Sequence, residues 1–197
     1  MNTDQLLGQS KVLIQWLDEQ INGTEFESEV RSQIAVSCLD LTLEHQKSIV
    51  VLISQSFYGS AFALVRVIFE AYVRGVWLYR CASDADLELF KDDKLDQKKK
   101  IGKLIGDLEK LPGYNRGVLS KAKTEWFNAM CSYTHSGYLA ARRRLIEDAV
   151  TPNYAEDQIT EVLKWANALG IMAAIELAQM ADNPRLVQTL LAKFREM

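Results

Sequence analysis

Three charged residues stand in the most apolar stretch of this chain. Arg66, Glu70 and Arg74 are spaced by four residues, which places them on one face of a helix. Their neighbours are almost all apolar, so we expect at least Arg66 and Glu70 to be partly buried. A buried charge is costly unless it is paired. The three residues therefore form either a structural ladder of ion pairs or part of a functional pocket, and their spacing leaves both open.

The second candidate is His135, in the segment Ser132–Gly137. A histidine at a helix end can project into a cleft, where it suits acid–base catalysis at neutral pH. The alternative is a helix-terminal histidine that bonds to the last carbonyls of its own helix. The other histidine, His45, continues an apolar line through Cys38 and Leu41, which favours a core or groove-edge position over a ligand.

The chain lacks the sequence patterns that several kinds of chemistry require. Two histidines without HExxH or ExxH spacing argue against a metal, and there is no phosphate-binding glycine loop and no G-x-S-x-G elbow. We therefore expect no metal and no cofactor. Three scattered cysteines indicate free thiols in a reducing compartment. The N-terminus lacks the layout of a signal peptide, and charges interrupt the apolar stretch 57–78, so we predict a cytoplasmic protein outside the membrane.

Composition is that of an average soluble protein. The 197 residues are 48% apolar and 25% charged, with a formal net charge of −3. These values exclude bulk disorder and a strongly basic nucleic-acid coat. The lysine-rich segment 91–103 and the arginines at 142–144 are typical of solvated helix faces, although they could also attract the phosphates of RNA.

Apolar residues recur at helical spacing along the whole chain. The pattern predicts an all-α fold: one domain over residues 1–197, an up-and-down bundle of about seven helices. Residues 1–24 form an N-terminal helix, 26–150 the bundle core and 151–197 a C-terminal helical pair. The helix expected over 60–81 is apolar on almost every side, so it belongs in the middle of the bundle or at a subunit interface.

Two segments carry a family resemblance: residues 64–84 around LVRVIFEAYVRGVWL, and YTHSG at 133–137. They resemble a family of small uncharacterised bacterial helical proteins, which are distantly similar to the HEPN group. The likeness covers about residues 43–154. HEPN proteins include ribonuclease toxins and defence effectors, many of them dimers, so the resemblance implies a HEPN-like bundle, a homodimer and a possible RNA or protein partner.

The HEPN motif itself is missing. HEPN ribonucleases carry an Arg separated from the catalytic His by four to six residues on one helix, whereas Asn128, Ala129 and Met130 occupy those positions before His135. An arginine would have to come from Arg66 on another helix. Asn128 is polar and could line the same cleft, but it cannot replace a cation.

Two functions follow. The first is a metal-independent ribonuclease-type effector of bacterial defence or a toxin–antitoxin system. In it, His135 acts as general acid or base, Arg66 holds the scissile phosphate and Glu70 orients either residue; Arg74, Asn128, Tyr133 and Ser136 are secondary candidates. The second is a non-catalytic dimerisation or interaction module, such as an antitoxin- or immunity-like partner. Its basis is the apolar helix 60–81 and the small-residue face of Ala166, Gly170, Ala173 and Ala174.

Overall fold

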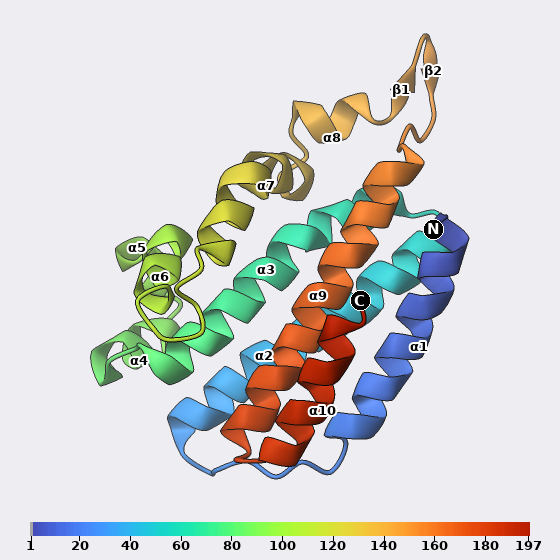
Figure 1. The fold of residues 1–197 in the computed structure, drawn as a ribbon. Helices are drawn as coiled ribbons and strands as arrows, with labels where there is room; N and C mark the ends of the chain where they lie inside the picture. The colour runs from blue at the N-terminus through green and yellow to red at the C-terminus, as the bar shows by residue number, and fades with distance from the viewer. Residues whose placement is uncertain (1) are drawn as a thin grey trace.

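The computed structural model describes residues 2–197, and these residues are almost entirely helical (Figure 1). Five long helices make up most of the fold, and short helices and one hairpin connect them. The elements are α1 (Thr3–Ile21), α2 (Val30–Ser54), α3 (Tyr58–Arg80), α4 (Asp84–Lys91), α5 (Leu95–Lys98), α6 (Ile101–Leu108), α7 (Val118–Thr134), α8 (Tyr138–Arg142), β1 (Leu145–Ile146), β2 (Ala149–Val150), α9 (Glu156–Met180) and α10 (Pro184–Arg195). The all-α prediction is confirmed.

The described residues hold ten helices, whereas the sequence predicted about seven. The difference comes mainly from α5 and α8, which have four and five residues and are too short to show an apolar period. The antiparallel β1–β2 hairpin was also missed; its strands have two residues each and are exposed. It extends beyond the end of the bundle in Figure 1.

Local sequence sets several helix ends. Asn183 caps α10, and Pro184 follows at the first helical position, where its missing N–H costs nothing. Ser83 caps α4 in a capping box with Asp86. Asn2 caps α1 in the same way with Gln5, whereas α3 begins at Tyr58 without a side-chain cap.

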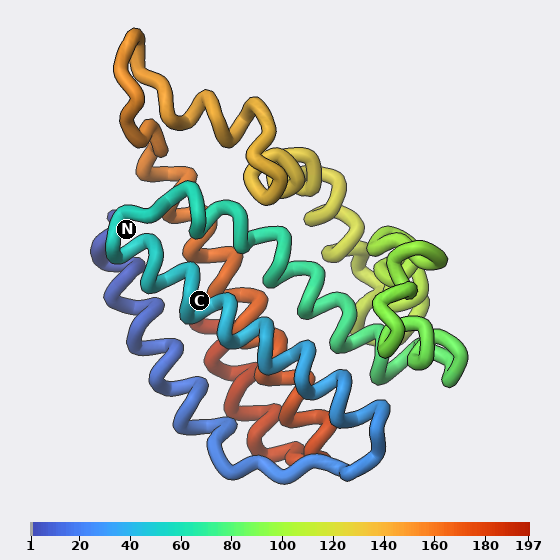
Figure 2. The backbone as a smooth tube through the Cα atoms, turned by 180° about the vertical axis from the view of Figure 1, so that it is seen from behind, coloured from blue at the N-terminus to red at the C-terminus, as the bar shows by residue number. Residues whose placement is uncertain are grey.

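Helix α3 lies at the centre of the bundle, where it packs against α2, α6, α7 and α9. The two views agree that it runs between α2 and α7 (Figures 1 and 2). Its residues Phe69, Tyr72 and Trp77 are among the largest fully buried side chains of the described chain. Each contributes roughly 1.5–3 kcal/mol by leaving water. The helix that carries Arg66, Glu70 and Arg74 is therefore held rigidly by its other faces.

The small-residue face of α9 packs inside this chain. Ala166, Ala173 and Ala174 are at most 1% exposed, and α9 contacts α1, α2 and α3. At Gly170 the approach is so close that an added Cβ would overlap the side-chain amide of the buried Gln46, which would have to move. The face to which Gly170 belongs is therefore packed within the chain and is not available to a second subunit.

Candidate functional site

Arg66, Glu70 and Arg74 form a continuous ladder along α3. The Nε of Arg66 donates to Oε1 of Glu70 at 2.8 Å, and Nη1 of Arg74 donates to Oε2 of the same carboxylate at 2.9 Å. Their side chains are 23%, 13% and 19% exposed, in sequence order. The expectation of partial burial is confirmed for all three. One carboxylate thus pairs with two guanidinium groups in an environment with little water, which leaves the three residues with a net positive charge.

The C-terminal end of α7 is fixed in a Schellman turn. Ser136 adopts a left-handed conformation with φ of 52°, and the N–H of Gly137 donates to the carbonyl of Ser132 at 2.7 Å. One residue before His135, the hydroxyl of Thr134 donates to the carbonyl of Ala63 on α3 at 3.0 Å. The last turn of α7 is thereby attached to α3 one helical turn from Arg66.

This attachment brings His135 against Arg66. The Nη1 of Arg66 lies 2.6 Å from Nε2 of His135, across 69 residues of sequence. A guanidinium group has only N–H donors, so in this contact Nε2 of His135 is the acceptor. His135 is exposed at the rim, while Arg66 is mostly covered. Within residues 2–197 Nη2 of Arg66 has no protein partner and can bind a ligand.

A groove of about 480 Å³ runs beside these residues, between α2, α3, α4, α5 and the end of α7. Arg74 lines it and donates from Nη2 to Oδ2 of Asp96 at 2.8 Å. Five side chains therefore form one connected row: Asp96, Arg74, Glu70, Arg66 and His135. Arg74 is paired with two carboxylates and Arg66 with only one, so the charge of Arg66 is the less compensated of the two.

Two further residues of the groove were not predicted as site residues. His45 and Cys38 of α2 line the groove, seven residues apart and so on one helix face. Burial lowers the pKa of His45, against the opposing effect of Glu44. Burial also raises the pKa of the Cys38 thiol to about 11, despite the charge of Arg74. The sequence feature that could have identified His45 as a groove residue is its place on the apolar stripe of α2, which packs against α3.

The four secondary candidates do not all lie at the groove. Arg74 lines the groove, but Tyr133 points to the other side of α7, where its ring packs edge-on against Phe62 at a centroid distance of 5.0 Å. Ser136 is exposed and serves the turn. Asn128 is exposed on α7 and does not line the groove. The expectation that Asn128 shares the cleft with His135 is therefore wrong.

Over residues 2–197, no cluster of three or more His, Cys, Asp or Glu side chains could hold a metal ion. In the same range, no helix is long and apolar enough to cross a membrane. The groove offers a cation, an imidazole beside it and a carboxylate that fixes the cation. This set can bind an anionic group and remove a proton next to it.

Comparison with known proteins places the chain in a family but supplies no activity. No curated protein matches it, and no solved structure matches it. Residues 39–196, which include every residue of the groove except Cys38, match a family model. The chain therefore belongs to the family described as a family of unknown function, DUF6988.

Proposed function

We propose that the groove is the active site of a metal-independent endoribonuclease. The carrying observation is the 2.6 Å contact between Nη1 of Arg66 and Nε2 of His135, which joins two helices that are distant in sequence. A phosphate-binding cation and a proton acceptor beside each other are what cleavage of RNA by its own 2′-hydroxyl requires. Glu70 supports this by fixing Arg66; it bonds to Arg66 and not to His135.

The reaction begins when the phosphate takes the place of His135 on Arg66. The guanidinium of Arg66 binds a non-bridging oxygen of the scissile phosphate, and Nε2 of His135, released from Nη1, takes the proton of the adjacent 2′-hydroxyl. The 2′-oxygen forms a bond to phosphorus while the bond from phosphorus to the 5′-oxygen breaks. The 5′-oxygen takes a proton from water, and the products are a 2′,3′-cyclic phosphate and a 5′-hydroxyl. A positioned general base contributes about 10²–10⁴-fold to such a step.

In this proposal the chain is a distant HEPN-like protein of bacterial defence or toxin–antitoxin systems. It takes its arginine from α3, because the arginine position on α7 is occupied by Asn128, Ala129 and Met130. RNA is the substrate, and the cytoplasm is the expected location.

The proposal is tested with purified protein, total RNA and EDTA. We expect cleavage by the wild type, a loss of about 10²–10⁴-fold in His135→Ala, and a comparable loss in Arg66→Ala. Arg116→Ala is the matched control, because Arg116 is exposed and lies outside the groove. An oligonucleotide with a single 2′-deoxy residue at the cleaved position should resist. Absence of cleavage, or equal cleavage by His135→Ala, removes the proposal.

The competing interaction module loses its main support. Its two features were the all-round apolar helix and the small-residue face, and both are buried within the chain. A homodimer stays a prediction, which light scattering tests directly. A protein partner likewise stays a prediction.

A further inference from the structure

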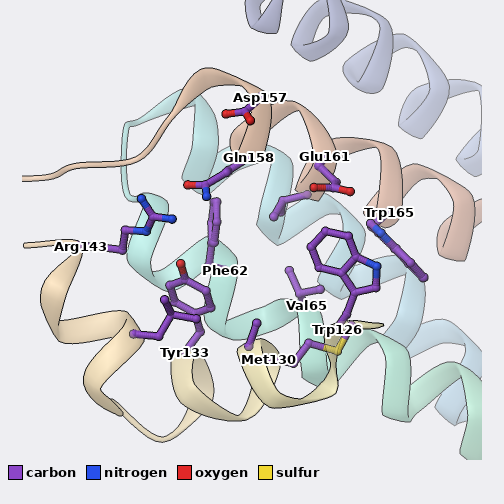
Figure 3. Close-up of a pocket in the computed structure, with 13 residues that line it drawn as sticks. Phe62, Val65, Trp126, Met130, Tyr133, Arg143, Asp157, Gln158, Glu161 and Trp165 are labelled. Atoms are coloured by element: carbon purple, nitrogen blue, oxygen red, sulfur yellow. The ribbon is translucent and has the colours of Figure 1, made fainter. Parts of the chain in front are cut away.

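A second cavity lies on the other side of α7 from the groove. It has a volume of about 360 Å³, within the range of small-molecule pockets, and lies between α3, α7, α8 and α9. Four aromatic side chains form its walls, and Figure 3 shows them facing one another across it: Phe62, Trp126, Tyr133 and Trp165. Trp126 and Trp165 meet edge to face, with ring centroids 6.3 Å apart.

One end of this cavity holds polar atoms without partners. Three buried side-chain polar atoms in residues 2–197 lack a hydrogen bond, and two of them, Nε of Arg143 and Oε1 of Gln158, belong to residues that line the cavity. Figure 3 shows both side chains at one end, with the hydroxyl of Tyr133 directed toward them. A buried donor and a buried acceptor left unpaired are costly, so this end is suited to a ligand group that both accepts and donates.

The rim of the cavity is acidic. Asp157 and Glu161 follow each other by one turn of α9, a like-charge spacing that weakens a helix. Among residues 2–197 neither carboxylate forms an ion pair. Burial and the charge of Asp157 raise the pKa of Glu161, against the effect of Lys164. Figure 3 shows Glu161 beside Trp126 and Trp165.

We infer that this cavity binds an arylalkylamine: a protonated aliphatic amino group attached to a planar aromatic ring that carries a hydroxyl at its far end. The ammonium group lies at Glu161 and the two indole rings, which attract a cation through their faces. The aromatic ring of the ligand lies among the four aromatic side chains of the cavity. The hydroxyl accepts from Nε of Arg143 and donates to Oε1 of Gln158, which satisfies both orphaned atoms. The cation belongs at the Glu161 end because Arg143 would repel it at the other.

Three probes separate these contributions in isothermal titration calorimetry with the full chain. They are tyramine, 2-phenylethylamine, which lacks the hydroxyl, and 4-hydroxyphenylethanol, which lacks the charge. We expect tyramine to bind at least about tenfold more tightly than the neutral alcohol, equivalent to about 1.4 kcal/mol and within the range of a desolvated cation–π contact. Tyramine should also bind more tightly than 2-phenylethylamine.

Variants locate the site. Glu161→Gln should weaken tyramine about tenfold and leave the alcohol unchanged, while Gln158→Leu should abolish the advantage of tyramine over 2-phenylethylamine. Asp148→Asn is the matched control, since Asp148 is exposed on the hairpin. Circular dichroism checks that each variant is folded.

Three results would overturn the inference: no binding of tyramine up to roughly 10 mM, equal affinity for the amine and the alcohol, or an unchanged preference in Glu161→Gln. None of these depends on ribonuclease activity, so the two proposals fail separately.

Discussion

Replacing Glu70 by Gln tests whether the ladder on α3 is an integrated unit. The carboxylate accepts from two arginines at 2.8 and 2.9 Å, and its side chain is only 13% exposed. An amide of the same size has one acceptor oxygen, so it can serve one arginine and turns its NH₂ group toward the other. Hydrogen bonds to charged groups contribute about 1.5–3 kcal/mol, and breaking a fully buried pair costs about 3–5 kcal/mol. Because Arg74 keeps Asp96, we expect a loss of about 1.5–3 kcal/mol.

Urea unfolding measures this loss as a lower midpoint at unchanged slope. In a thermal scan it corresponds to about 2–4 °C for each kcal/mol in a chain of this size. Glu88→Gln is the matched control: Glu88 pairs with Lys91, but their side chains are 67% and 44% exposed. Such a pair contributes about 0–1 kcal/mol. If Glu70→Gln is as mild as Glu88→Gln, the ladder is a solvated surface feature and the reasoning about partial burial fails.

Three further predictions concern packing and protonation. Gly170→Ala should destabilise the protein by about 1–3 kcal/mol because the new Cβ meets Gln46. Gly8→Ala should instead stabilise α1 by up to about 1 kcal/mol, because an added Cβ there has no atom within 4 Å. Denaturant unfolding of both variants measures the two changes in stability. Burial raises the pKa of Cys38 to about 11, so at pH 8 a thiol reagent should modify it only after unfolding, which mass spectrometry detects; modification at the rate of an exposed cysteine would contradict this. The pKa of His45 is lowered by burial, so its imidazole should be neutral at pH 7 and its NMR titration should have a midpoint below that of a model histidine; a midpoint above that value would refute the assignment.

Much of the fold could be predicted because helices leave a periodic trace. The run Ile49–Ile53 reads as a strand by itself, yet it is helical because the surrounding apolar period continues through it. Segments shorter than two turns leave no such trace, which is why α5, α8 and the hairpin were missed. The consequence reaches the site, because α5 supplies Asp96.

Spacing on one helix was a reliable guide to the site, and pairing between helices was not. The contacts of Glu70 with Arg66 and Arg74 follow directly from a spacing of four residues. Tyr133 and His135 are two residues apart, so a helix directs them to opposite sides, and they line different cavities. The contact of His135 with Arg66 was a hypothesis, since it depends on how the end of α7 is seated on α3.

The last turn of α7 separates the groove from the aromatic cavity. Tyr133 faces the aromatic cavity and His135 faces the groove, and the bond from Thr134 to Ala63 holds the turn between them. The two residues belong to one short stretch of backbone, so a ligand that shifts this turn at Tyr133 also changes the distance from His135 to Arg66. Any coupling between the two cavities is reciprocal: each ligand then changes the affinity of the other by the same factor.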